Sequence, residues 1–248
     1  MSEKINVLGV GFDNVTMDEA VEAALALMAQ GKSAYVVTPN PEIVMDCRRD
    51  PAAAEAVDAA ALTIPDGIGV IYGSRILHTP LKEKVGGCDF TLRLFGRMEP
   101  EEKRVFILGG KPGVAEMAAE NLRAQFPRLR FVGAQDGYFK DDAPVVEAIN
   151  AAAPDLLLVC LGAPKQEKWM HANQSALRVG LMIGAVGSVD VYAGTVDRAP
   201  KVWCDAGLEW LYRLLKEPKR IRRQMALPKF MLLVIGARLT KKSPMRKK

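Results

Sequence analysis

Several patterns that mark particular classes of protein are missing from this sequence. Its 248 residues include two histidines and four cysteines without a CxxC pair (Cys47, Cys88, Cys160 and Cys204). These residues lack the spacing of a zinc site, and dispersed thiols are typical of a reducing compartment. The first residues, MSEKINVLGVGF, lack the basic and apolar regions of a secretory signal. We therefore expect a cytoplasmic protein with reduced thiols, no metal and no other cofactor.

Two common nucleotide-binding motifs are also missing. The segment GVGFDN at 9–14 lacks the last glycine of GxGxxG, and no GxxxxGK[ST] occurs. Their absence disfavours a P-loop enzyme and a nucleotide-sugar epimerase or dehydrogenase, an alternative that nicotinamide binding would test. No Asp-x-Asp motif occurs either, which counts against glycosyl transfer through a metal held by that motif.

Apolar runs and helical segments alternate along the chain. The runs lie at 5–9, 34–38, 61–64, 104–109, 130–134, 155–162 and 179–186. Amphipathic segments cover 17–30, where Thr16 and Glu19 have capping-box spacing, and 113–126, 141–153 and 165–178. The alternation predicts an α/β fold, with a mainly parallel Rossmann-like sheet and helices on both faces.

Turn-forming segments follow five of the apolar runs. They are TPNPE, PDGIG, GGKPG, GAPKQE and GAVGSVD. In an open parallel sheet, the loops at the carboxyl ends of the strands lie at one edge, where ligands bind and helix N-termini present free N–H groups. We expect one cleft to collect these loops, although ordinary strand-to-helix turns explain any single one of them.

Charge is distributed unevenly along the chain. The chain has 34 Lys/Arg and 29 acidic residues. The segment from Arg213 to Lys248 contains 13 of the basic residues and one acidic residue, so its net charge is +12 and that of the preceding residues is −7. Such a basic block usually meets phosphate on a membrane, a nucleic acid or a nucleotide. We predict an α/β domain over 1–199 and a basic, helical C-terminal appendage over 200–248.

Seven segments of the chain resemble the WecG/TagA/CpsF glycosyltransferases in order and spacing. They are TPNPEIV (38–44), IPDGIGV (64–70), GGCDF (86–90), FILGGKPGVAE (106–116), CLGAPKQEKWM (160–170), GAVGSVDVYAGTVDRAP (184–200) and GLEWLYRLLKEPKRIRR (207–223). The resemblance implies a bacterial inverting transferase that needs no metal. It would use a UDP-sugar to extend a lipid-pyrophosphate-linked N-acetylglucosamine at the inner membrane face.

The reaction expected from the resemblance moves N-acetylmannosamine to the 4-hydroxyl of undecaprenyl-pyrophosphate-linked N-acetylglucosamine, for a surface polysaccharide or a teichoic acid linkage unit. Alternative donors are the uronic acid of UDP-N-acetylmannosamine, UDP-glucose and UDP-glucuronic acid. Lys84 replaces an arginine common in the family, and GAVGSVD replaces GVGGSFD; both changes bear on the donor. Whether the chain forms a homo-oligomer stays open.

Asp66 is the expected catalytic base, because inverting transfer needs a carboxylate to take the proton of the acceptor hydroxyl. Taken alone, Pro65-Asp66-Gly67 is also ordinary turn chemistry, and Asp often caps a helix. The match to the family motif favours catalysis, with Asp89 and Asp190 as rivals. Thr38 and Asn40 are expected to orient the base or sugar hydroxyls, while Asn40 also suits a helix N-cap before Pro41.

Further residues are expected to bind the donor. Gly109 and Gly110 suit close approach to a phosphate or to uridine, Lys165 suits pyrophosphate, and Gln166 suits uracil or sugar hydroxyls. Asp190 suits a sugar hydroxyl. Without a metal, arginines must neutralise the leaving UDP, and these are Arg213, Arg220 and Arg223. A solvated basic face is the alternative for these arginines.

The C-terminal segment is expected to lie on the membrane surface. Its apolar run, Phe230 to Ala237, has eight residues, whereas a spanning helix needs about 20. Flanking Lys and Arg residues suit anionic lipid, which predicts a peripheral protein at the inner face. The alternatives are a core-packing helix with a solvated basic end and a non-catalytic binding protein. Nucleic acid is not an expected partner, because Phe230 is the only aromatic residue after Tyr212.

Overall fold

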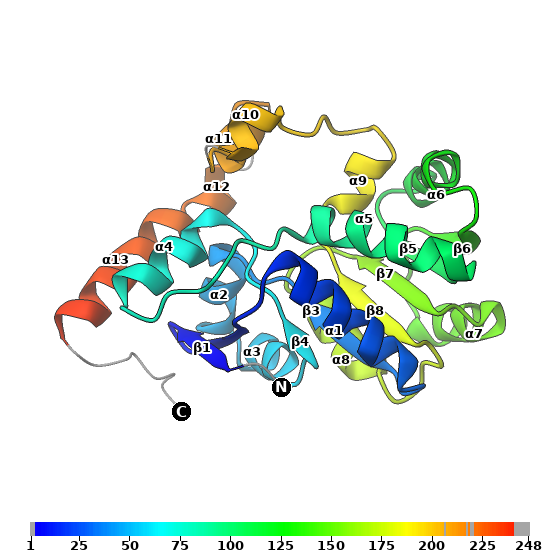
Figure 1. The fold of residues 1–248 in the computed structure, drawn as a ribbon, viewed down its shortest axis with the longest axis horizontal. Helices are drawn as coiled ribbons and strands as arrows, with labels where there is room; N and C mark the ends of the chain where they lie inside the picture. The colour runs from blue at the N-terminus through cyan, green and yellow to red at the C-terminus, as the bar shows by residue number, and fades with distance from the viewer. Residues whose placement is uncertain (1–2, 206, 217, 219–220, 241–248) are drawn as a thin grey trace.

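The computed structural model describes residues 3–205, 207–216, 218 and 221–240, without the side chains at 201, 205, 213, 222 and 223. It shows an α/β architecture in which helices cover both faces of a parallel sheet (Figure 1). This architecture confirms the predicted fold class.

Strands and helices alternate over the middle of the chain, from β5 to α9, and several helices follow one another elsewhere in the described residues. The strands are β1 (Lys4–Val7), β2 (Val10–Asp13), β3 (Ala34–Val37), β4 (Leu62–Thr63), β5 (Arg104–Gly109), β6 (Arg130–Gln135), β7 (Leu156–Cys160) and β8 (Leu181–Gly184). The helices are α1 (Met17–Ala29), α2 (Pro41–Cys47), α3 (Pro51–Asp58), α4 (Ile68–Ile76), α5 (Gly87–Met98), the 3-10 turn η1 (Glu99–Glu101), α6 (Val114–Gln125), α7 (Asp142–Ala152), α8 (Lys165–Asn173), α9 (Ser188–Tyr192), α10 (Lys201–Asp205), α11 (Glu209–Lys216), α12 (Ile221–Gln224) and α13 (Ala226–Leu239).

The six-stranded sheet has the order β4-β3-β8-β7-β5-β6, and every pairing in it is parallel. Side chains of one strand alternate between the two faces. In β7, Leu156 and Leu158 pack in a core with α1, α5, α6 and α9, whereas Leu157 and Val159 pack in a second core with α2, α3, α7, α8 and α13. Apolar side chains on both faces explain why these strands read as continuous apolar runs.

The first apolar run forms a structure that the sequence pattern did not predict. Residues 5–9 belong to an antiparallel hairpin of β1 and β2, separate from the six-stranded sheet. Leu8 and Gly9, at the turn, both have positive φ, 55° and 95°, as the tight two-residue turns of hairpins require. The expectation that this run joins the parallel sheet is therefore wrong.

Helix starts follow the local sequence closely. Thr16 and Glu19 form the predicted capping box at the start of α1. The segment 165–178 contains a shorter helix than predicted, because α8 ends at Asn173.

The C-terminal helix α13 packs against α2 and α4, beside which it lies in Figure 1. Phe230, Val234 and Ala237 face this contact and are buried. The fit depends on Gly73 of α4, because a methyl group built there would lie 3.0 Å from the Phe230 ring. One face of α13 therefore matches the core-packing alternative. The domain division at residue 200 stays a prediction.

Candidate active site at the carboxyl edge of the sheet

The five predicted loops all follow carboxyl ends of strands in the same sheet, and hydrogen bonds join them to one another. The Asp66 N–H donates to the Pro39 carbonyl (3.2 Å), which links the loops after β4 and β3. The Gly110 N–H donates to the Cys160 carbonyl (3.3 Å), which links the loops after β5 and β7. The Cys160 thiol lies 3.1 Å from the Ala185 carbonyl beyond β8. The shared edge is therefore as predicted.

Asp66 lies half-buried between the end of β4 and the start of α5. Its Oδ2 accepts a hydrogen bond from the Gly87 N–H at 3.4 Å. Helix α4, which follows Asp66 in the chain, has Gly67 as its N-cap residue and no side-chain hydrogen bond at its cap. Asp66 therefore does not act as the N-cap of α4, which was the ordinary role weighed against catalysis.

Thr38 and Asn40 lie next to Asp66 but are differently engaged. The Thr38 hydroxyl is buried and donates to the Gly184 carbonyl at 3.0 Å. Asn40 Oδ1 accepts from the Ile43 N–H at 3.0 Å, so Asn40 is the N-cap of α2. A buried, bonded hydroxyl is suited to fixing the backbone around the site. This bond joins the residue after β3 to the last residue of β8.

The rival carboxylates have other surroundings. Asp89, in the first turn of α5, forms an ion pair with Arg198. A methyl group built on Gly86 would lie 3.6 Å from Asp66 and 3.8 Å from Asp89, so both carboxylates flank this glycine. Asp190 is half-buried in α9. Burial raises the pKa of the Cys160 thiol to about 12, and the nearby charge of Asp190 adds to this rise.

Gly109, the last residue of β5, and Gly110 lie close to other parts of the chain. A methyl group built on Gly109 would lie 2.3 Å from the Cys160 carbonyl oxygen, and the φ of Gly109 is 135°. Gly110 has a φ of 75° and accepts a hydrogen bond from the Gly137 N–H. Gly109 therefore needs to be glycine for the contact between β5 and β7, and Gly110 for its positive φ and its close approach to Val114 and Val189.

Lys165 and Gln166, both expected to bind the donor, take different positions. The Lys165 ammonium donates to the Gly137 carbonyl (3.1 Å) and lies 5.0 Å from the centre of the Phe139 ring. Gln166 is fully buried beneath Gly184. Gln166 therefore lies behind the edge that the loops form.

The predicted arginines fall largely outside the described part of the chain. Arg220 lies outside the described residues, and the side chains of Arg213 and Arg223 are also outside them. A different arginine, Arg198, brings a guanidinium to the start of α5 through its ion pair with Asp89. In the sequence, Arg198 stands out only as part of the segment GAVGSVDVYAGTVDRAP that resembles the family.

Glu167, next to Gln166, is a buried carboxyl group that the sequence patterns did not single out. Its carboxyl is fully buried, and burial raises its pKa to about 7. The sequence contains one signal of its burial, because Glu167 stands three positions before the apolar residue Met170. Helical spacing places Glu167 on the same inward side as Met170.

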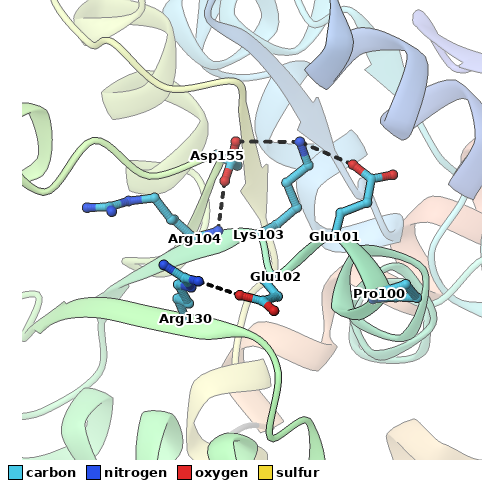
Figure 2. Close-up of a pocket in the computed structure, with 7 residues that line it drawn as sticks. All are labelled: Pro100, Glu101, Glu102, Lys103, Arg104, Arg130 and Asp155. Atoms are coloured by element: carbon cyan, nitrogen blue, oxygen red, sulfur yellow. Dashed lines mark hydrogen bonds and ion pairs between the residues drawn. The ribbon is translucent and has the colours of Figure 1, made fainter.

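Two hollows lie at the opposite, amino edge of the sheet. One, of about 460 Å³, is lined by residues around the starts of β5 and β6, where Lys103 bridges Glu101 and Asp155 and Arg130 pairs with Glu102 (Figure 2). The other, of about 810 Å³, lies beside Lys32, His171 and Arg178. In the first hollow the charged groups pair with one another, except that the Arg104 guanidinium donates to the Ala152 and Ala153 carbonyls, and such mutual pairing is typical of a structural contact.

The residues that the structure describes offer neither a metal-binding cluster nor a membrane-spanning helix. Among them, no three His, Cys, Asp or Glu side chains are grouped so that they could hold a metal ion. No helix in the described ranges is long and apolar enough to cross a membrane.

Comparison with known proteins gives consistent matches over most of the chain. The family model described as "Glycosyl transferase WecG/TagA/CpsF family" matches residues 5–244. An N-acetylglucosaminyldiphosphoundecaprenol N-acetyl-beta-D-mannosaminyltransferase of Bacillus spizizenii is 36% identical over 83% of this chain and 80% of the relative. Relatives of the same name from Bacillus subtilis and Staphylococcus aureus are 34% and 33% identical, over 85% and 95% of this chain and 82% and 93% of their own lengths.

Proposed function

This chain belongs to the WecG/TagA/CpsF family of glycosyl transferases, and on that premise we propose that it transfers N-acetylmannosamine from UDP to N-acetylglucosamine-pyrophosphoryl-undecaprenol. The acceptor atom is the 4-hydroxyl oxygen, and the anomeric carbon is inverted. Relatives that match 83–95% of this chain share one activity name, and this agreement carries the proposal.

In the proposed reaction, Asp66 is the general base. Its carboxylate takes the proton of the acceptor hydroxyl while the oxygen attacks the anomeric carbon and the bond from that carbon to the UDP phosphate breaks. UDP leaves with the bonding electrons. The half-buried position of Asp66 at the carboxyl edge supports this role, as does the engagement of the rival Asp89 by Arg198.

The leaving UDP needs positive charge, since its diphosphate gains charge as the bond breaks. Arg213, Arg220 and Arg223 are proposed to supply it from the basic segment. Lys165, Gly109 and Gly110, at the carboxyl edge of the sheet, are proposed to bind the donor as well. Asp190 is proposed to accept a hydrogen bond from a sugar hydroxyl. No metal takes part in this scheme.

The proposed acceptor is lipid-linked, and α13 supports contact with the membrane surface. Leu232, Ile235 and Leu239 are 71%, 44% and 79% exposed, on the side away from buried Phe230 and Val234. An exposed apolar face flanked by basic residues suits the headgroup region of anionic lipid. We therefore propose that the protein acts at the inner face of the membrane, attached to its surface through α13.

The reaction can be tested with purified protein and a soluble analogue of the lipid-linked acceptor. UDP-N-acetylmannosamine, its uronic acid, UDP-glucose and UDP-glucuronic acid are supplied in parallel, with and without EDTA. We expect the first donor to be used fastest, EDTA to leave the rate unchanged, and NMR of the product to show an inverted anomeric configuration.

Each part of the proposal has its own contrary result. Preference for another donor would overturn the assignment of N-acetylmannosamine, and a retained configuration would overturn inversion. A loss in EDTA that magnesium or manganese restores would show that the reaction needs a metal.

A further inference from the structure

The inward face of α8 buries polar atoms that have no hydrogen-bond partner in the described part of the chain. These atoms are Gln166 Oε1, Glu167 Oε2 and Trp169 Nε1. Both Gln166 and Glu167 are completely buried. Because an unpartnered buried polar group destabilises the folded state, apolar residues at these positions would stabilise the helix contact. A polar pair at such a position therefore suggests a role other than stability.

Gln166 and Glu167 lie beneath the end of β8, close to the candidate active site. Gln166 Nε2 donates to Glu167 Oε1 at 2.9 Å. The same amide packs on the last residue of β8, since a methyl group built on Gly184 would lie 2.8 Å from Gln166 Nε2. The Gly184 carbonyl in turn accepts the Thr38 hydroxyl at 3.0 Å.

Contacts continue from Thr38 to the proposed base. A methyl group built on Gly87 would lie 3.2 Å from Thr38 Oγ1, so the two residues are close neighbours. The Gly87 N–H donates to Asp66 Oδ2. A line of contacts thus runs from Glu167 through Gln166, Gly184 and Thr38 to the residue that holds Asp66.

The charges around Glu167 do not explain its presence. Burial is the main cause that raises its pKa, and the nearby carboxylate of Asp46 in α2 raises it further. Lys168, the next residue of α8, is paired with Asp50. The strands beneath α8, which are β3, β7 and β8, contain no Asp, Glu, Lys or Arg. No cation among these neighbours compensates the Glu167 carboxylate.

We infer that Glu167 is a positioning residue for sugar transfer, and this inference rests on the proposed function. Its carboxyl holds the Gln166 amide against Gly184, and this contact fixes the Gly184 carbonyl that orients Thr38 beside Gly87 and Asp66. The role requires an acceptor oxygen at Glu167 Oε1. A glutamine side chain supplies such an oxygen, and a leucine side chain does not.

The test compares Glu167→Gln with Glu167→Leu. We expect Glu167→Leu to lower kcat at least tenfold with a donor KM within threefold of the wild-type value, and Glu167→Gln to keep kcat within threefold. Combining Glu167→Leu with Thr38→Val is expected to lower kcat no further than the worse single variant, because both act on one contact line. Trp169→Phe, which removes another unpartnered polar atom of the same face, is the matched control with normal kcat.

A second readout does not depend on the reaction. In protein labelled at threonine methyl groups, NMR is expected to show a shifted Thr38 signal in Glu167→Leu and an unshifted one in Glu167→Gln and Trp169→Phe. If the wild type transferred no sugar, the proposed function would fail while the Thr38 signal would still decide the positioning role.

Several results would overturn the inference. They are a normal kcat or a normal Thr38 signal in Glu167→Leu, equal losses in the leucine and glutamine variants, and multiplied losses in the double variant. If Glu167→Leu does not fold, as circular dichroism would show, Gln166→Met breaks the same pair from its donor end. Normal kcat in that variant would overturn the inference equally.

Discussion

At the scale of single residues, Asp66 stands apart from the other carboxylates of the site. Asp89 has Arg198 as its ion partner, and Asp190 lies on α9 near Cys160. Asp66 lies where the loops after β3 and β4 meet the start of α5. These surroundings support Asp66 as the carboxylate that meets the acceptor.

Asp66→Asn is expected to lower kcat about 100-fold or more, because it removes general-base assistance while keeping the shape of the side chain. UDP binding by calorimetry and the Tm should stay close to the wild-type values. Asp89→Asn is the matched control, with a loss below tenfold. A normal turnover number for Asp66→Asn would exclude Asp66 as the base and direct the test to Asp89 and Asp190.

The raised pKa of Glu167 predicts how the free energy of unfolding depends on pH. Its pKa is about 7 in the folded chain against 4.5 as the ordinary value, so the unfolded chain binds fewer protons between these pH values. The contribution of Glu167 to the free energy of unfolding therefore falls as pH rises from 4.5 to about 7, by about 3 kcal/mol in total. Below pH 4.5 the contribution is constant.

Glu167→Gln removes this titration. Relative to wild type, its free energy of unfolding is expected to rise by about 3 kcal/mol between pH 4 and pH 8, measured by urea denaturation. Taking the difference between the two proteins cancels the titration of the other groups. A difference that does not vary with pH would show that the Glu167 carboxyl has an ordinary pKa.

At the scale of elements, α13 is apolar on two opposite sides. Phe230 and Val234 are buried against α2 and α4, whereas Leu232 and Leu239 are exposed. A helix that is apolar all round is usually surrounded by apolar material. The two sides of α13 can be tested separately.

Phe230→Ala is expected to lower the free energy of unfolding by about 3 kcal/mol or more, because it leaves a cavity between α13 and Gly73 of α4. Leu232→Ala, on the exposed side, should change it by less than about 0.5 kcal/mol. Urea denaturation measures both. Equal effects from the two substitutions would contradict the docked position of α13.

At the scale of the whole molecule, the candidate active site lies at the carboxyl edge of the sheet and the two hollows lie at its amino edge. The C-terminal segment reaches the reaction edge, since a methyl group built on Gly207 would lie 3.0 Å from Ile68, the first residue of α4. Leu227 of α13 likewise contacts Gly69. Membrane contact through α13 would therefore hold the membrane near the helix that follows Asp66.

Membrane contact predicts that the protein pellets with anionic liposomes and that salt weakens this binding. Leu232→Glu combined with Ile235→Glu should reduce binding about tenfold or more, because both side chains belong to the exposed face. These substitutions leave Phe230 docked, unlike truncation after Gln224. Equal recovery of the wild type and this variant in the supernatant at low salt would exclude surface attachment through α13.

The sequence by itself determined the local features of the chain. Apolar runs predicted the strands of the parallel sheet, Thr16 and Glu19 predicted the start of α1, and five loops were assigned to one edge. These features follow from residues a few positions apart, because caps, turns and periodicity arise within one or two turns of chain. The family motifs likewise singled out Asp66.

Only the tertiary structure decided which residues meet across the fold. Thr38 binds Gly184, 146 positions away, and Arg198 binds Asp89, 109 positions away. It also decided that residues 5–9 form a separate hairpin and that Glu167 is buried beneath β8. No local pattern records such pairings, because they depend on the order of strands in the sheet and on which helix covers which face.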